Sequence, residues 1–357
     1  MAPYNLERVS ILLVEDNRYV RNIIQDLLRH FRFGRVSVCS NGEEAIDFLK
    51  SMGSAAMPGG TAALDIVISD LVMSPINGLL LLRWLRSAKE SPNRFLPFIM
   101  LSGAADREYV NACRDLGGTE FLAKPFAVET VYRHILEVID YPRQFVATQH
   151  YFGPDRRRRV LPPSDGHERR IAREEDAVVV YSSERVVKPQ ETADVWFFRL
   201  PNRLKEKAGG LGKGGGEPGD IPLDLLREAE AMLDRAALDF AQWATTYLAK
   251  LSDLCTDAVM KPGRRDSYFR EINLLAHELR GQGGTFGYPL VSMFGKMLYD
   301  LTGENCREDD NAVEIVKAHI DAMRAVLREK IAGDGGKIGR DLLVSLNQAL
   351  DKYSVVR

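Results

Sequence analysis

The sequence predicts an α/β domain with a doubly wound parallel sheet, followed by an all-α helical bundle. Over residues 1–142, short apolar runs rich in β-branched residues alternate with amphipathic stretches, which is typical of parallel strands joined by crossover helices. Over residues 221–357, apolar residues recur at helical spacing instead. Residues 143–220 are rich first in arginine and then in glycine, which predicts a basic and flexible linker between two domains.

Two of the predicted strands end in carboxylates. The run Leu64–Ile68 leads into Asp70, and the run Val9–Val14 leads into Glu15 and Asp16. Because ligands bind at the carboxyl ends of the strands in an open α/β sheet, we expect these side chains to converge. Gathered carboxylates repel one another and need a cation, and oxygen ligands beside a phosphate suit Mg2+. On its own stretch alone, Asp70 could equally be a cap of the turn that follows its strand.

Two further predicted strands end in other polar side chains. The run Phe98–Leu101 is followed by Ser102, and the run Glu120–Ala123 is followed by Lys124. The Lys124 ammonium can hold a phosphoryl oxygen or pair with Asp70, and the Ser102 hydroxyl can donate to the same oxygen. Four strand ends with complementary chemistry favour a phosphoryl-transfer site over coincidental turn residues.

Residues 4–140 resemble the receiver domain of two-component response regulators. The resemblance implies that Asp70 is the phosphoacceptor. It also implies that Glu15 and Asp16 help to hold Mg2+, with the carbonyl oxygen of Val72 as a further ligand.

The same resemblance makes Ser102 the switch hydroxyl and Lys124 the invariant lysine, followed by a cis Pro125. Two positions depart from the family pattern. Phe121 occupies the aromatic switch position and has no hydroxyl, and Pro75 stands one place later than the usual Met-Pro. Both departures concern the output surface and leave the phosphorylation site as expected.

The remaining elements of the first domain complete five strands and five helices. Val36–Val38 is a predicted strand, Asn41–Ser51 a helix capped by Asn41, and residues 53–63 a loop. One-sided apolar spacing predicts the other four helices at Val20–Phe31, Leu79–Leu85, Asp106–Leu116 and Val128–Ile139. This alternation predicts a flavodoxin-like sheet.

The linker contains the arginine run Arg156–Arg159 and a glycine-rich stretch at residues 208–220. Arginine runs can bind nucleic-acid backbones, acidic surfaces or the receiver's own acidic pocket. Interspersed acidic residues reduce the net field here, so we expect a solvated tether; a nucleic-acid-binding regulator is the alternative. Ala177–Tyr181 and Val195–Leu200 are strand-like but too few for a sheet of their own, and we expect them to dock on a neighbour.

Five amphipathic stretches after residue 221 predict an up-and-down helical bundle. One long apolar stripe runs from Met232 to Leu251. The others fall at residues 272–279, 291–301, 313–327 and 338–353. Their methionines and aromatic residues are expected to form the core.

One predicted helix of this bundle contains His277, followed by glycines at 281, 283, 284 and 287. Each glycine inside a helix costs about 1 kcal/mol relative to alanine. We therefore expect a bare helix surface on which another protein can approach the imidazole closely. Arg280 lies on the same face and can neutralise a phosphoryl group. The alternative is that the glycines end the helix and that His277 is a surface or packing residue.

The segment resembles the histidine phosphotransfer (Hpt) motif. His277 stands at the phosphorylated position, a base follows at the third place, and Gly281 and Gly287 follow at the fourth and tenth. Arg280 replaces the usual lysine and keeps the charge.

A phosphorelay protein is therefore expected, acting as a phosphoacceptor and phosphotransfer protein without enzyme activity of its own, because no ATP-binding glycine motif appears. Its expected partners are a sensor or hybrid histidine kinase and another receiver or Hpt protein. The rival is a phosphorylation-controlled adaptor whose bundle serves docking or dimerisation without phosphotransfer.

Composition limits the other function classes. The chain has 357 residues with 48 Lys and Arg against 50 Asp and Glu, a net charge of −2, which argues against nucleic acid as a partner of the whole chain. Four cysteines lack metal or redox spacing and fit a reducing cytosol. No run has membrane-spanning length and the start lacks a signal-peptide plan, so we expect a cytoplasmic protein without membrane insertion.

Overall fold

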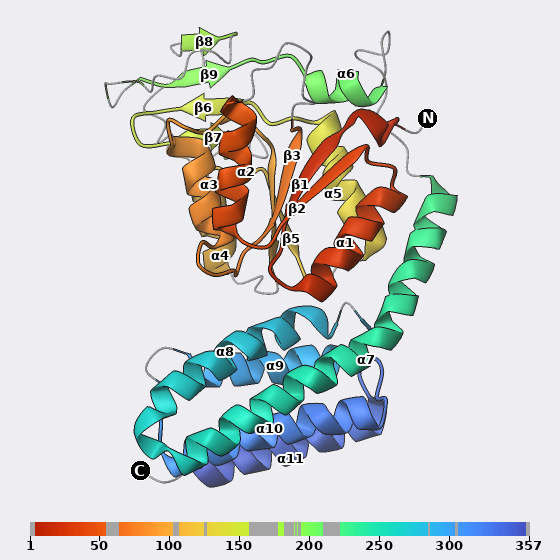
Figure 1. Cartoon of the computed structure of the whole chain (residues 1–357), viewed down its shortest axis with the longest axis vertical. Helices are drawn as coiled ribbons and strands as arrows, with labels where there is room; N and C mark the ends of the chain where they lie inside the picture. The colour runs from red at the N-terminus through yellow and green to blue at the C-terminus, as the bar shows by residue number, and fades with distance from the viewer. Residues whose placement is uncertain are drawn as a thin grey trace, which may run out of the picture. The chain divides into compact units, whose positions relative to one another are not determined.

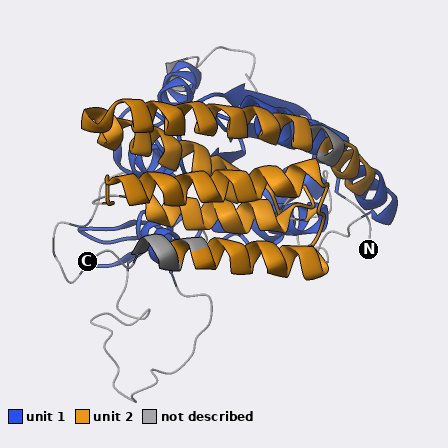
Figure 2. Ribbon diagram, turned by 90° about the horizontal axis from the view of Figure 1, so that it is seen from below, with its two compact units in different colours: residues 1–122, 128–229 blue, residues 123–127, 230–357 orange. Residues whose placement is uncertain are grey.

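The structure is a computed structural model. It describes residues 4–54, 64–102, 107–124, 127–156, 178–181, 189, 191, 194–209, 222–284, 286–303 and 306–354. It divides into two compact units, residues 1–122 with 128–229 and residues 123–127 with 230–357 (Figure 2). Most of the loop predicted at 53–63, Pro125, the arginines at 157–159 and the glycine-rich stretch beyond residue 209 lie outside the described residues.

The first unit contains a five-stranded sheet in the order β2-β1-β3-β4-β5 (Figure 1). Its strands are β1 (Ser10–Val14), β2 (Arg35–Cys39), β3 (Ile66–Asp70), β4 (Phe98–Ser102) and β5 (Glu120–Ala123). β1 pairs in parallel with β2 and β3, and β3 pairs in parallel with β4. Every residue of β1, β3 and β4 is buried, as apolar runs covered on both faces require. The predicted doubly wound α/β fold is confirmed.

Five helices accompany these strands. They are α1 (Arg18–His30), α2 (Gly42–Ser54), α3 (Gly78–Ser87), α4 (Arg107–Asp115) and α5 (Val128–Asp140). Asparagine side chains accept hydrogen bonds from backbone N–H groups in the first turns, since these groups have no partner within the helix. Asn17 accepts from Tyr19 at 3.0 Å, and Asn77 accepts from Leu80 at 2.9 Å. The predicted cap Asn41 accepts from the N–H of Glu44 at 2.9 Å.

A second sheet follows the receiver-like part of the chain, and the sequence had not predicted it. Its strands are β6 (Phe145–Ala147), β7 (Phe152–Pro154), β8 (Val178–Val180) and β9 (Trp196–Phe198), in the order β7-β6-β9-β8. β6 pairs antiparallel with β7 and β9, and β8 runs parallel to β9. The two strand-like runs were expected to be too few for a sheet of their own and to dock on a neighbour, and they do so as β8 and β9, because β9 pairs with β6.

An aromatic cluster joins this second sheet to the loop before β4. The ring of Phe95 lies with its centroid 5.1 Å from each of the rings of Phe145, Phe152 and Phe198. The Arg94 guanidinium lies 4.6 Å from the centroid of the Phe152 ring. The described strands of the predicted linker are thus packed on the first domain.

Arg86, near the end of α3, ties together the backbone around the aromatic cluster. Its guanidinium is buried and donates to the carbonyl oxygens of Arg94, Leu96 and Gly117 at 2.8, 2.8 and 3.0 Å. It also lies 5.2 Å from the centroid of the Phe145 ring. Backbone carbonyls therefore satisfy this buried cation.

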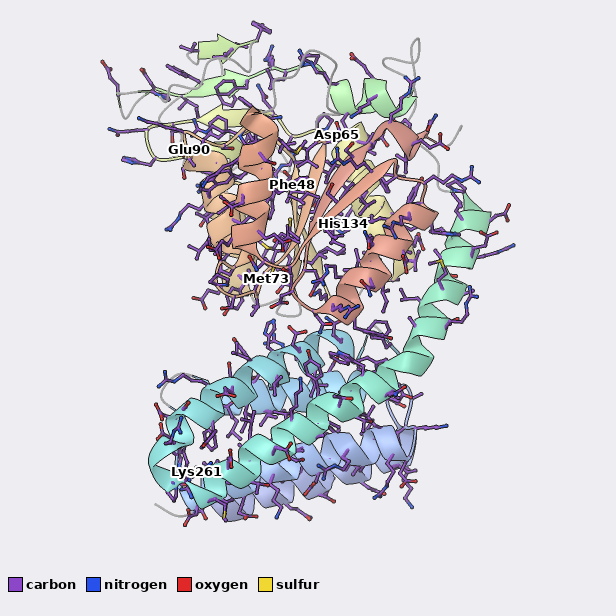
Figure 3. All side chains as sticks on the ribbon, in the orientation of Figure 1. Phe48, Asp65, Met73, Glu90, His134 and Lys261 are labelled. Atoms are coloured by element: carbon purple, nitrogen blue, oxygen red, sulfur yellow. The ribbon has the colours of Figure 1, made fainter. Side chains whose placement is uncertain are left out.

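The helix α6 (Arg203–Gly209) is held to the rest of the first unit by two ion pairs. Lys205 forms an ion pair with Asp140 at 3.1 Å, at the end of α5. Lys207 pairs with Asp65, the residue before β3 that Figure 3 labels. Asp65 also accepts from the N–H of Ser10 at 2.8 Å. Two lysines of α6 thus fasten it to the end of α5 and to the residue before β3.

The second unit is helical, as predicted. Its helices are α7 (Leu223–Met260), α8 (Arg265–Gln282), α9 (Pro289–Leu301), α10 (Asp310–Arg328) and α11 (Gly336–Ser354), and the first turns of α7 belong to the first unit. α9 packs against α8 and α10, and α10 packs against α11. Phe240, Phe269 and Phe294 are fully buried in this core. Among the described helices, none has an apolar stretch that could cross a bilayer.

Candidate functional site

Three carboxylates meet at the carboxyl ends of β1 and β3. One carboxylate oxygen from each of Glu15, Asp16 and Asp70 lies within 4.8 Å of the other two. Glu15 and Asp16 directly follow β1, and Asp70 is the last residue of β3, its neighbour in the sheet. Glu15 and Asp70 are buried and Asp16 is exposed. The structure therefore brings together the three acids that the sequence singled out.

The backbone after β1 is fixed by α1. The Arg21 guanidinium donates to the carbonyl oxygens of Glu15 and Asp16 at 2.8 and 3.3 Å. The N–H of Glu15 donates to the carbonyl of Cys39 at the end of β2, at 3.1 Å. Arg21 was not predicted as part of the site, although a base one turn into the helix after an acidic pair is a signal for it.

The backbone after β3 is fixed by a glycine. The N–H of Gly78, the first residue of α3, donates to the carbonyl of Leu71 at 2.9 Å. A Cβ atom at Gly78 would lie 2.2 Å from the carbonyl oxygen of Asp70. Only glycine therefore lets α3 begin so close to the acid, and Val72 is half-buried in the turn between them.

The other predicted residues lie on the next two strands. Ser102 is the last residue of β4 and is fully buried, one position beyond Leu101, which stands opposite Asp70 in the register. Lys124 directly follows β5 and is buried. Phe121 within β5 is half-buried and packs against the core of the first domain. The Ser102 hydroxyl and the Lys124 ammonium thus lie at the ends of β4 and β5, the two strands that follow β3 in the sheet.

The carboxylate cluster fits a hard divalent cation. All the donor atoms in it are oxygens, and two of its three acids are buried. Like charges brought this close in a buried site destabilise one another, so a cation is the natural complement. Mg2+ prefers oxygen ligands and retains waters, and one exposed acid leaves room for them.

His277 and Arg280 lie together on α8, against α9. The His277 ring lies edge-on to the ring of Tyr299, with 5.4 Å between centroids, and the Arg280 guanidinium lies 5.4 Å from the same centroid. His277 is 4% exposed and Arg280 is 6% exposed. A Cβ at Gly295 of α9 would lie 2.8 Å from the backbone nitrogen of Arg280, so α9 packs closely here. The expected bare surface beside His277 is instead a packed one.

The glycines after His277 serve mainly to make a turn. α8 ends at Gln282, so only Gly281 lies within the helix, where it is buried. A Cβ at Gly283 would lie 2.7 Å from the backbone of Tyr288 and Ser292, and Gly287 has a φ of +82°. The interpretation that these glycines keep a helix surface bare was therefore wrong for the ones beyond Gln282. The sequence had left this outcome open as the alternative.

Comparison with known proteins finds a family and relatives that match about a third of the chain. A family model described as the response regulator receiver domain matches residues 11–136. The 3',5'-cyclic-nucleotide phosphodiesterase regA of Dictyostelium discoideum is 32% identical over 137 residues, which are 38% of this chain and 16% of that protein. The sensory/regulatory protein RpfC of Xanthomonas campestris pv. campestris is 34% identical over 117 residues, 33% of this chain and 15% of that protein. The chain thus matches a small part of each relative.

Solved structures match a similar share of this chain. The chemotaxis protein CheY4 of Vibrio cholerae is 24% identical and covers 36% of this chain and 98% of its own, with a TM-score of 0.31.

Proposed function

Because residues 11–136 form a response regulator receiver domain, we propose that this chain is a phosphorelay protein. Asp70 accepts a phosphoryl group from the phosphohistidine of a sensor or hybrid histidine kinase. His277 of the helical bundle exchanges a phosphoryl group with the aspartate of a receiver domain. The observation that carries the proposal is the approach of Glu15, Asp16 and Asp70 to within 4.8 Å.

The receiver residues have separate tasks in the first transfer. An Asp70 carboxylate oxygen attacks phosphorus while the bond to the donor's imidazole nitrogen breaks, and the leaving imidazole takes up a proton. The Lys124 ammonium holds one phosphoryl oxygen, and the Ser102 hydroxyl donates to another. When bound to Glu15, Asp16, Asp70 and the carbonyl of Val72, Mg2+ supplies the charge that offsets the gathered oxygens. The chain acts as an acceptor, with no nucleotide chemistry of its own.

The second transfer uses the bundle. A nitrogen of the neutral His277 ring attacks the phosphorus of a phosphoaspartate, and the bond to the aspartate oxygen breaks to return a free carboxylate. Arg280, which lies 5.4 Å from the centroid of the same Tyr299 ring, supplies a counter-charge for the phosphoryl oxygens. The aspartate that exchanges with His277 is Asp70 of the same chain or the aspartate of a receiver domain in another protein.

One observation favours a second candidate function. His277 is only 4% exposed, whereas a phosphoryl acceptor must admit in-line attack. In this candidate the chain is an adaptor, and phosphorylation of Asp70 controls docking or dimerisation through a bundle that transfers no phosphate.

A transfer between two full-length variants separates the two candidates. A His277→Gln chain is phosphorylated at Asp70 with radioactive phosphate, freed of donor, and mixed with a tagged Asp70→Asn chain. We expect label on the tagged chain in an acid-labile, alkali-stable form, which is the signature of phosphohistidine. A tagged Asp70→Asn chain that also carries His277→Gln is the matched control and should stay unlabelled. No label on the first acceptor would favour the adaptor, and label on the control would move the site away from His277.

A further inference from the structure

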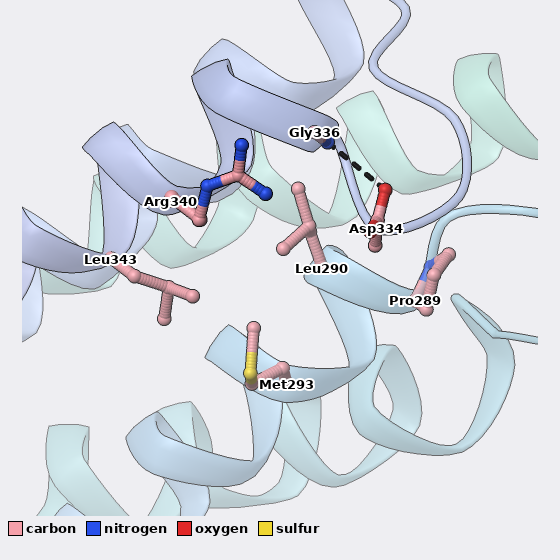
Figure 4. Close-up of a pocket in the computed structure, with 7 residues that line it drawn as sticks. All are labelled: Pro289, Leu290, Met293, Asp334, Gly336, Arg340 and Leu343. Atoms are coloured by element: carbon pink, nitrogen blue, oxygen red, sulfur yellow. Dashed lines mark hydrogen bonds between the residues drawn. The ribbon is translucent and has the colours of Figure 1, made fainter.

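The helical bundle contains a cavity that the proposed phosphotransfer does not use. Its volume is about 440 Å3, within the usual range for small-ligand pockets. Figure 4 shows its lining, which comes from the start of α9, the loop before α11, and α11 itself. The lining residues are Pro289, Leu290, Met293, Asp334, Gly336, Arg340 and Leu343.

The floor of this cavity is fixed by close backbone packing. Leu290 is 2% exposed. A Cβ at Gly335 or Gly339 would lie 2.7 or 3.1 Å from the Leu290 Cδ1 atom, so the glycine backbone makes room for this side chain. The N–H of Gly333 donates to the carbonyl of Gly287 at 3.0 Å and ties the loop to the turn before α9. The backbone on this side of the cavity is therefore held in place by the fold itself.

The two charged residues at the cavity, Asp334 and Arg340, differ in their hydrogen bonding. An Asp334 carboxylate oxygen accepts from the N–H of Gly336 at 3.0 Å, which stabilises the loop itself (Figure 4). Within the described part of the chain, no hydrogen bond or ion pair involves the Arg340 guanidinium. An arginine with five donors thus borders a surface made by Leu290, Met293 and Leu343. A ligand that satisfies both has a hydrocarbon part and an anionic acceptor group, such as a carboxylate.

We propose that this cavity binds a small amphipathic carboxylate. Its hydrocarbon part lies against Leu290, Met293 and Leu343, and the Arg340 guanidinium donates to its carboxylate oxygens. Met293 adapts its unbranched side chain to the shape of the ligand. Because Arg340 is exposed, its ion pair contributes modestly, so apolar burial supplies most of the affinity and the charge supplies selectivity.

Nuclear magnetic resonance of the full-length protein with isotope-labelled methionine methyl groups tests the proposal. Met293→Leu identifies the Met293 signal, which is then followed during titration with octanoate, 1-octanol or octylammonium. We expect a saturable shift, with octanoate bound roughly two- to fivefold more tightly than 1-octanol and octylammonium bound most weakly. Arg340→Gln should remove the preference for octanoate over 1-octanol. Arg328→Gln, which changes an exposed arginine of α10, should keep it.

Two results would overturn the proposal. One is no movement of the Met293 signal up to the solubility limit of octanoate. The other is equal binding of all three probes, because an apolar surface without a charged recognition group would show no preference for the carboxylate. Leu343→Asp adds a carboxylate to the lining and should abolish octanoate binding while the circular dichroism spectrum stays unchanged. Octanoate binding that survives this substitution would place the ligand elsewhere and reject the assignment.

Discussion

Gly78 holds the start of α3 against the backbone of Asp70. With a Cβ placed only 2.2 Å from the Asp70 carbonyl oxygen, Gly78→Ala must displace either the helix or the acid. We expect a loss of about 1–3 kcal/mol in the free energy of unfolding, measured by urea denaturation, and slower phosphorylation of Asp70. Gly263→Ala is the matched control, because a Cβ at Gly263 meets nothing within 4 Å. Equal stability of the two variants would contradict the close contact at Gly78.

His319 makes the bundle sensitive to acid. Burial lowers the pKa of His319 below its ordinary value of about 6.5, and its Nδ1 lies 2.8 Å from the carbonyl oxygen of Ile315. Below that pH the unfolded chain binds a proton at this residue more readily than the folded chain does. Its contribution to stability is therefore present above about pH 6.5 and is lost as the pH falls toward 5.

The test compares urea unfolding, followed by helical circular dichroism, between about pH 7 and pH 5. His319→Gln should lose less stability over this interval than the unaltered protein, because its side chain does not titrate. His150→Gln, which changes an exposed histidine of the first unit, should behave like the unaltered protein. An unchanged pH dependence in His319→Gln would show that His319 is not responsible.

At the scale of elements, the first sheet was predictable and the second was not. β1, β3 and β4 are fully buried five-residue strands with at least three apolar residues each, so the sequence alone marks them. β6 and β7 have three residues each and show no periodicity. Phe145 of β6 stands opposite Phe198 of β9, and no local pattern indicates a pairing across so long a stretch of chain.

The surroundings of His277 were missed for a related reason. Its place on a helix and the neighbouring Arg280 follow from the sequence. Its burial depends on Tyr299 and Gly295, which belong to the next helix. Helical spacing shows which residues share a face, and only tertiary packing decides which face is covered.

The aromatic junction makes the second sheet part of the first domain. Phe95 contacts three rings of that sheet, so Phe95→Ala should lower the free energy of unfolding by roughly 2–3 kcal/mol. Urea denaturation measures the loss. Tyr181→Ala removes an aromatic side chain that is 70% exposed and should change stability little. If Phe95→Ala were equally harmless, the described strands after residue 142 would be a loosely attached segment.

At the scale of the whole molecule, the acidic cluster of Glu15, Asp16 and Asp70 and the arginine run Arg156–Arg159 belong to one nearly neutral chain. The net charge is −2. Arg156, the described member of the arginine run, pairs with Asp115 at 3.3 Å and lies 4.1 Å from the centroid of the Tyr151 ring. This arginine is engaged within the first unit, and whether the run binds nucleic acid stays a prediction, tested by salt-dependent binding to duplex or single strand.

The most direct measurement is phosphate incorporation from acetyl phosphate into the full-length protein, with Mg2+ and with a chelator. We expect one phosphoryl group per chain when Mg2+ is present, in the alkali-labile form of an acyl phosphate, and none with the chelator. Asp70→Asn should abolish the label. Asp47→Asn, which changes an exposed aspartate of α2, should retain it. Stoichiometric, Mg2+-dependent label that persists in Asp70→Asn would contradict the assignment of Asp70 as the phosphoacceptor.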